Sequence, residues 1–174
     1  MAYERLTGQR CLATGRCHFD RENSKEHGEL ISNIIFRGIA MIYTVKRIED
    51  DVFIFITYHK EESQDEKNYV DGKPDYADAF EDDLIFKWDS QIGKGLDSSY
   101  MKDVLEAERK HLLVKKSDAE TSFYYMGQFT VVEARNARKE DNRGRMQPIT
   151  KVMMKMQHPV REDLLRYLQS NITA

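Results

Sequence analysis

The chain has 174 residues, of which 40% are hydrophobic and 33% charged, and its formal net charge is −3. This length suits a single domain with its own core, and the hydrophobic content argues against an intrinsically disordered chain. The lack of a long apolar run and the presence of 2 cysteines predict a cytoplasmic protein with no membrane partner and no disulfide framework.

Residues 1–38 are interpreted as an N-terminal extension, because they show no clear hydrophobic period. Within them, residues 24–36 are predicted to form a helix, since Leu30 and Ile34 follow Ser24, which is a suitable N-cap residue. Residues 39–174 are expected to form the domain proper.

Strand-like runs, rich in β-branched and aromatic residues, dominate the domain. Residues 39–47 and 51–60 predict an antiparallel hairpin. Further strands are predicted at 84–88, 111–116, 122–134 and 148–158, with a polar turn over 135–147. Phe86 and Trp88 are expected in the core.

Two helices are predicted, one over residues 98–111 and one over residues 159–171, with Pro159 near the start of the second. Each has apolar side chains along one face: Met101, Val104 and Leu105 in the first, and Leu164, Leu165 and Leu168 in the second. Together these elements predict a mainly β (α+β) fold, a pseudobarrel of about six or seven strands with flanking helices.

The charges are unevenly distributed along the chain. Acidic residues dominate 61–83, whereas basic residues dominate 135–155. A basic face can therefore coexist with an acidic total, and a phosphate backbone responds to the local field. Such clusters are also common on solvated surfaces, so charge alone leaves nucleic-acid binding open.

No arrangement of residues predicts an active site. Four candidate zinc ligands lie near the N-terminus: Cys11, Cys17, His18 and His27. Their spacing does not match a zinc finger or knuckle. Asp75, Glu108 and Lys110 imitate the acid, then acid-x-lysine pattern of metal-dependent nucleases, but Glu108 and Lys110 fall in a predicted helix, where that site needs a strand. We therefore expect no catalytic residue, no metal and no cofactor.

Three polar loops carry side chains suited to phosphates and base edges. The first follows the strand that ends in His59 and Lys60, and adds Ser63, Gln64, Lys67 and Asn68. The second follows Trp88 and contains Asp89, Ser90, Gln91 and Lys94, with Ser98 and Ser99 opening the next helix. The third contains Asn136, Arg138, Arg143 and Arg145. Backbone N–H groups at the helix start would face an anion, and Asp97 or Ser98 is also expected to cap that helix.

Four blocks of the sequence resemble a single family pattern: "FIFITYHKEES", "YADAFEDDLIFKWDSQ", "HLLVKKSDAETSFYYMGQFTVVEA" and "QPITKVMMKMQHPVREDLLRYL". The family is an uncharacterised domain found at the C-terminal end of bacterial helicases fused to a phospholipase-D-like nuclease, in defence and restriction loci. The resemblance spans residues 39–168. Asp89 departs from it, because the family usually has a polar amide there, and the loop after Gln91 lacks the family's serine-rich sequence.

A strand, a tryptophan, "DSQ", a polar loop, "SSY" and an amphipathic helix follow one another in this chain. This order resembles the pseudobarrel of plant B-three-type transcription factors and of restriction-endonuclease specificity domains. In that fold two loops, an N-arm and a C-arm, grip DNA and read the major groove. The resemblance implies a C-arm at residues 89–99 and an N-arm in the loop after His59.

The resulting hypothesis is a sequence-specific duplex DNA-binding domain of a restriction or defence nuclease system. It would read the major groove with two arms, take phosphate contacts from Lys94, Arg143 and Arg145, and perform no chemistry itself. A nuclease domain or a helicase subunit would be a further partner. Two alternatives stay open: a protein-interaction module that docks such a partner, and a metal-dependent nuclease.

Overall fold

A computed structural model of the chain describes residues 10–12, 45–59, 69–70, 73–74, 78–117, 119, 122–141 and 143–170. Within these residues the fold is mainly β with two helices, as the sequence predicts. The strands are β1 (Arg10–Leu12), β2 (Val45–Ile48), β3 (Asp51–His59), β4 (Tyr69–Val70), β5 (Lys73–Pro74), β6 (Ala79–Phe80), β7 (Ile85–Asp89), β8 (Arg109–Ser117), β9 (Ser122–Glu140) and β10 (Met146–Met156), and the helices are α3 (Ser99–Glu106) and α4 (Glu162–Gln169).

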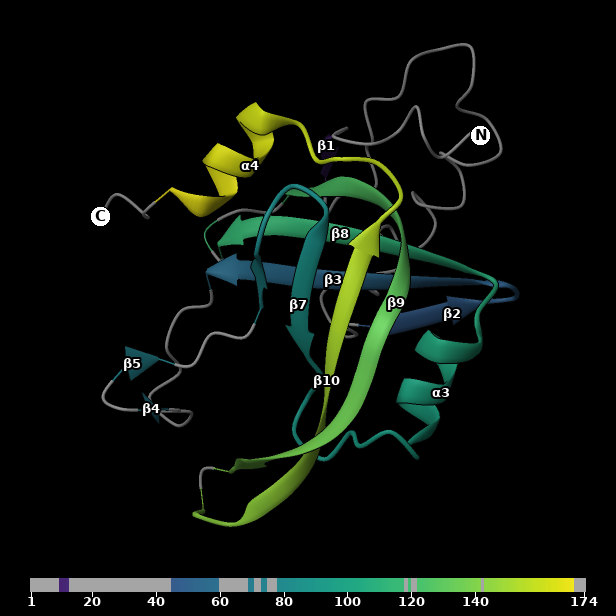
Figure 1. The fold of residues 1–174 in the computed structure, drawn as a ribbon, viewed down its shortest axis with the longest axis vertical. Helices are drawn as coiled ribbons and strands as arrows, with labels where there is room; N and C mark the ends of the chain where they lie inside the picture. Colours follow the sequence, from purple (N-terminus) through teal and green to yellow (C-terminus); the bar gives the residue numbers. More distant parts are fainter. Residues whose placement is uncertain are drawn as a thin grey trace.

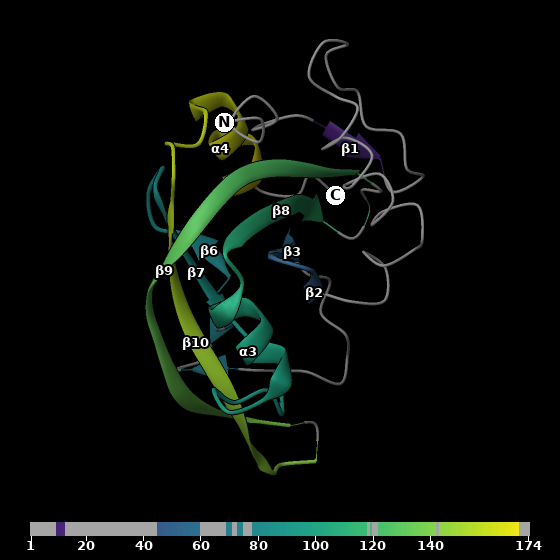
Figure 2. The ribbon, with the colours of Figure 1, turned by 90° about the vertical axis from the view of Figure 1, so that its right-hand side faces the viewer.

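The main sheet is mixed and has the strand order β2-β3-β8-β9-β10-β7-β6, while β1 pairs with β9. Neighbouring strands are antiparallel, except that β3 and β8 run parallel. β4 and β5 form a separate two-stranded ribbon. The sheet folds over on itself, so that β7 and β10 form one layer and β3 and β8 the other (Figures 1 and 2). The predicted pseudobarrel with flanking helices is therefore confirmed.

Strand β9 belongs to both layers and bends between them (Figure 2). Its first part pairs with β8 as far as Gln128, and its second part pairs with β10 from Phe129 onward. Met126 lies at a shift in register opposite β8, next to Gly127, whose φ is +109°. A bulge with a glycine in this conformation lets a strand turn sharply, and it directs the second half of β9 toward the β9–β10 hairpin.

The core lies between the layers and under the two helices. Its buried side chains come from both layers and both helices, and include Val52, Ile54, Phe86, Trp88, Met101, Val104, Leu112, Val152, Met154, Leu164 and Leu168. Trp88 is 3% exposed, which confirms its predicted place in the core. The apolar faces predicted for the two helices are also confirmed, since Leu105 and Leu165 pack against the same cluster.

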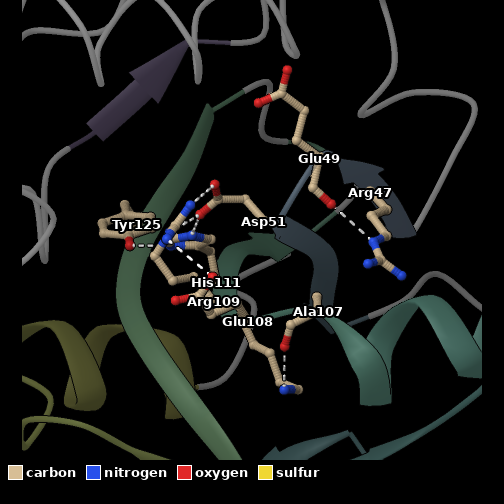
Figure 3. Close-up of polar contacts among 9 residues, drawn as sticks. Arg47, Glu49, Asp51, Ala107, Glu108, Arg109, His111 and Tyr125 are labelled. Carbon is tan, nitrogen blue, oxygen red and sulfur yellow. Dashed lines mark hydrogen bonds and ion pairs between the residues drawn. The ribbon is translucent and has the colours of Figure 1, made fainter.

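A buried polar network joins the starts of β3 and β8 to β9 (Figure 3). Asp51 accepts two hydrogen bonds from the Arg109 guanidinium at 2.9 and 2.8 Å, and a third from His111 Nε2 at 2.7 Å. His111 Nδ1 is hydrogen bonded to the Tyr125 hydroxyl at 2.6 Å. Burial alone would raise the pKa of Asp51, but the bonds from His111 and Arg109 outweigh burial and lower that pKa to about 2.

The same network corrects one predicted element. The sequence predicts a helix over 98–111, but α3 ends at Glu106 and β8 begins at Arg109. Arg109 N–H donates to the Asp50 carbonyl at 2.9 Å, and its side chain binds Asp51, so contacts with β3 override the local helical pattern. Lys110 is consequently a strand residue, and the prediction that Glu108 and Lys110 lie on a helix is wrong.

A second difference concerns the polar segment 135–147, which the sequence predicts to be a turn. In the structure β9 continues to Glu140 and β10 begins at Met146, so most of this segment is a two-stranded ribbon. Both faces of the ribbon are largely polar, which removes the alternation that marks a strand. The helix predicted over 24–36 lies outside the described residues. In the part of the chain that the structure describes, neither helix is long and apolar enough to cross a membrane.

Candidate nucleic-acid interface

The loop that follows β7, residues 90–98, is named the second arm here. Its first half runs along the free edge of β10. Ser90 N–H donates to the Thr150 carbonyl at 2.9 Å, and Gly93 N–H donates to the Pro148 carbonyl at 2.8 Å. These bonds continue the β7–β10 pairing beyond the last paired residues, so the arm begins as an extension of the sheet and is not a loose loop.

A tight turn within the arm exposes Gln91 and Gly93. Lys94 N–H closes the turn on the Gln91 carbonyl at 3.0 Å, and Gly93 has φ +88°. A positive φ at the third residue of a turn favours glycine, which explains the first glycine of the "GKG" sequence. The Lys94 ammonium lies 5.5 Å from the centroid of the Tyr100 ring, and the residue is half-buried.

The Ser90 hydroxyl connects the two ends of this turn. Ser90 is buried, and its Oγ accepts a hydrogen bond from Thr150 N–H at 2.8 Å while donating to the Lys94 carbonyl at 2.7 Å. The Thr150 hydroxyl donates to the same carbonyl at 3.0 Å. Ser90 therefore positions the backbone of the arm.

The second half of the arm packs against the β9–β10 hairpin. Leu96 N–H donates to the Asn136 side-chain carbonyl at 3.0 Å. A Cβ added at Gly95 would lie 3.4 Å from the Pro148 Cβ and 3.5 Å from the Asn136 side-chain oxygen, so this glycine marks a close approach. Asn136 therefore ties the second arm to the hairpin, and two segments far apart in the sequence form one structural unit.

Ser98 ends the arm and begins α3. Its hydroxyl accepts a hydrogen bond from Met101 N–H at 3.2 Å and donates to the Gly95 carbonyl at 2.6 Å. The predicted cap is confirmed at Ser98, and the predicted helix start is confirmed at Ser99. Ser99 is exposed.

Asp89 has a structural contact on the outer face of the sheet. Its carboxylate accepts from the Lys151 ammonium at 3.1 and 3.3 Å, across the β7–β10 pair, and the Asp89 side chain is 9% exposed. Burial raises the pKa of Asp89 above its ordinary value in spite of Lys151, with a smaller lowering contribution from Lys139. The ion pair fixes the start of the second arm.

The hairpin tip is organised by one carboxylate, that of Asp141. Asp141 Oδ1 accepts from the N–H groups of Arg143 and Arg145, each at 2.9 Å, while Oδ2 accepts from Arg145 Nε at 3.0 Å and Gln147 Nε2 at 3.1 Å. These bonds, the Arg145 backbone bond first, lower the pKa of Asp141 to about 2. Gly144 has φ +75°, which this turn requires.

A cavity of about 550 Å³ opens between the second arm and the hairpin. Its lining residues are Gly93, Gly95, Leu96, Asp97, Ser98, Asn136, Ala137, Arg138 and Pro148. The lining is mixed in polarity and includes two exposed charged residues, Asp97 from the arm and Arg138 from the hairpin. The cavity brings together residues of the second and third loops that the sequence predicts to contact DNA.

The charges around this unit are mostly positive. Arg135 lies 3.7 Å from Glu133, and Arg145 pairs with Asp141. Among the described residues, no acidic side chain forms an ion pair with Arg138, Lys139 or Arg143. Together with Lys94, these cations can donate hydrogen bonds to phosphate oxygens.

The remaining predicted contacts lie elsewhere. His59, at the end of β3, donates from Nε2 to the Leu168 carbonyl at 2.7 Å and so joins β3 to α4. In Figure 1, α4 and the hairpin tip lie at opposite ends of the molecule. Lys60, Ser63, Gln64, Lys67 and Asn68 lie outside the described residues, as do Asp75, Cys17, His18 and His27.

Lys110, from the nuclease-like pattern, donates to the Ala107 carbonyl at 2.7 Å, and burial lowers its pKa. Over the described ranges, no group of three or more histidine, cysteine or acidic side chains is arranged to hold a metal ion. The arrangement at the arm and hairpin can provide hydrogen bonds and positive charge to an anionic polymer.

Four further residues that were not predicted from the sequence belong to this unit: Asp141, Pro148, Thr150 and Lys151. Asp141 could have been found, because an aspartate followed two residues later by Arg143 and then Gly144 is typical of a tight turn. The other three act through pairing with β7 and the second arm, which no local pattern reveals.

The chain matches the family described as "Domain of unknown function (DUF3427)" over residues 38–168. It belongs to this family. No curated protein matches the chain.

Three solved structures resemble the fold. They are Arabidopsis thaliana SUVH6 in complex with SAM (10% identity, TM-score 0.43), KRYPTONITE in complex with mCHG DNA and SAH (12%, 0.38), and the sulfur binding domain and SRA domain of ScoMcrA complexed with phosphorothioated DNA (10%, 0.40). The matches cover 80, 75 and 77% of this chain but 26, 31 and 42% of those chains, respectively. The chain thus spans less than half of the length of each.

Proposed function

We propose that this chain is a sequence-specific duplex DNA-binding domain, the target-recognition part of a restriction or defence nuclease system, with no chemistry of its own. The observation that carries the proposal is the attachment of the second arm to the hairpin through Asn136 and Gly95. Because of it, the arm that carries Lys94 and the hairpin that carries Arg138 form one preorganised unit, and such units lose little conformational entropy on binding.

Within the proposal each residue of the unit has a role. Lys94, Arg138, Arg143 and Arg145 would contact phosphates, because they carry the positive charge of the unit. Gln91, which is exposed at the turn of the arm, would contact base edges. Asp89, Ser90 and Asn136 would hold the arm in place through the bonds described above. The loop after His59 would supply the first arm, as the resemblance to B-three-type pseudobarrels implies.

Fluorescence anisotropy with a labelled random-sequence duplex at low salt tests the proposal. Binding is expected there, because non-specific affinity is electrostatic and is strongest at low ionic strength. Lys94→Ala and Arg143→Ala should each weaken binding and reduce the slope of log K against log salt by about one. Arg166→Ala is the matched control, since Arg166 lies in α4, pairs with Glu162 and is far from the hairpin.

Two outcomes would replace the proposal. If no duplex binds at low salt, the chain is better explained as a module that docks a helicase or nuclease partner. If the purified chain cuts plasmid DNA in the presence of magnesium, and Lys110→Ala abolishes the cutting, the nuclease alternative is correct. If duplex DNA does bind, selection of bound oligonucleotides from a random pool would identify the recognised sequence.

A further inference from the structure

The outer part of the β9–β10 hairpin, residues 139–147, extends beyond the rest of the fold (Figures 1 and 2). The last bonds between hairpin and arm are those of Asn136 and Pro148. Beyond them lie the cross-strand pairs Lys139–Gln147 and Glu140–Met146, and then the turn. Within the part of the chain that the structure describes, the hydrogen bonds and ion pairs of 139–147 stay inside the hairpin.

We propose that this tip enters the major groove of duplex DNA as a two-stranded ribbon, beside the second arm. The inference rests on the proposed function and adds to it a third contact element and the groove that it occupies. The major groove is about 12 Å wide and about 8.5 Å deep, and it admits a two-stranded ribbon. About three residues of strand, on the order of 10 Å, project beyond the arm, which matches that depth.

The side chains of the tip have the chemistry that base edges require. In the groove Arg143 and Arg145 would meet base edges in place of the phosphates named above, because an arginine can donate two parallel hydrogen bonds to a guanine, the commonest specific contact there. Met146 is 56% exposed, although methionine is normally buried, and it can contact a thymine methyl group. The second arm would then meet the flanking phosphates through Lys94 and limit how deeply the tip inserts.

The tip is also preorganised. Asp141 receives hydrogen bonds from two backbone N–H groups and two side chains, so the turn has one shape before DNA arrives. Its charge is neutralised by Arg145, whereas Lys139 and Arg143 form no ion pair within the described residues and keep the tip cationic. A rigid ribbon with a cationic end is attracted to the groove and loses little entropy on entering it.

Disulfide cross-linking identifies the groove. Met146→Cys is combined with two duplexes, one with a thiol tether on a pyrimidine C5, which projects into the major groove, and one with a tether on guanine N2, which projects into the minor groove. We expect about tenfold more cross-linked product with the C5 tether. Val132→Cys is the matched control, because Val132 is equally exposed on β9 but away from the tip. The unmodified chain measures the background from Cys11 and Cys17.

Preferential cross-linking to the guanine N2 tether, or equal yields for Met146→Cys and Val132→Cys, would overturn the inference while anisotropy still reports DNA binding. Loss of all binding by the unmodified chain would instead overturn the proposed function. Because Met146 is exposed, its replacement leaves the core intact, and urea unfolding of the variant checks this directly.

Discussion

Asp51 and Asp141 are two carboxylates with similar partners in different surroundings. Each accepts hydrogen bonds from an arginine side chain and from other donors, and each has its pKa lowered to about 2. Asp51 is buried between β3 and β8, beside the fully buried His111. Asp141 lies at the far end of the hairpin, where its partners are the N–H groups and side chains of its own turn.

The difference shows how one chemical arrangement can serve two purposes. At Asp51 the bonded groups, Arg109 and His111, come from another strand, β8, so the carboxylate joins parts of the chain that are distant in sequence. At Asp141 the bonded groups are all within six residues of the carboxylate, so it shapes a local turn and adds nothing to the assembly of the sheet. Asp51 should therefore matter for folding, and Asp141 for binding.

The largest expected effect is that of Asp51→Asn. The change leaves the Arg109 charge without its bidentate partner and weakens the bond to buried His111, so the free energy of unfolding should fall by about 3 kcal/mol. Urea denaturation measures the loss, and DNA affinity of the folded fraction should not change. Asp163→Asn, which breaks an exposed ion pair with Arg161, is the control and should cost much less, because water and salt screen exposed pairs. Equal losses of unfolding free energy in the two variants would show that the bonds of Asp51 stabilise the fold no more than an exposed ion pair does.

The next effect is the acid dependence of stability that Asp51 produces. A pKa lowered from 3.8 to about 2 on folding stabilises the native state fully above 3.8, and this contribution is lost as the pH falls through about 2. The difference corresponds to about 2 kcal/mol. The free energy of unfolding should therefore fall more steeply with decreasing pH for the unmodified chain than for Asp51→Asn. The same pH dependence in both proteins would show that Asp51 is not ionised against its partners in the folded state.

The smallest effect on stability is expected for Asp141→Ala, and its main result should be weaker DNA binding. Removal of a negative charge alone would strengthen binding to DNA, so any loss of affinity must come from disorder of the tip. We expect a loss of about fivefold, the cost of ordering one or two side chains on binding. Glu140→Gln is the matched control, because it removes an exposed acid from the same hairpin while leaving the hydrogen bonds of Asp141 in place, and it should bind slightly better. An increase in affinity for both variants would show that the shape of the tip is unimportant.

Much of the fold was predictable because it follows local patterns. The apolar and β-branched runs around Val52, Phe86 and Leu112 locate three strands to within a few residues, and Ser98 locates a helix start. The end of α3 was not predictable, because Arg109 leaves the helical pattern to bind Asp51, a contact between residues far apart in sequence. The outer hairpin was missed for a different reason, since solvent on both faces removes the period-two pattern of a strand.

The candidate interface was predictable in its composition but not in its construction. Polar loops near Gln91 and Arg143 were recognised from their side chains. That Asn136 and Ser90 hold the arm, and that Asp89 pairs with Lys151, depends on strand register, which is set by the whole sheet. Side chains of the same type thus serve as supports or as proposed contacts, depending on the strand opposite.

The continuity of β9 has a consequence for local unfolding. Its first half carries Tyr125 of the buried network, and its second half carries Asn136 and the hairpin, with no loop between them. Amide groups on such a strand open mainly by fraying from a free end, since opening in the middle would break pairings in both layers. Exchange with solvent should therefore be fastest at the turn around Gly144 and slow progressively toward the bend at Gly127. The proposed recognition element is therefore the end of β9 that opens most readily, on a strand whose other half is paired in the second layer of the fold.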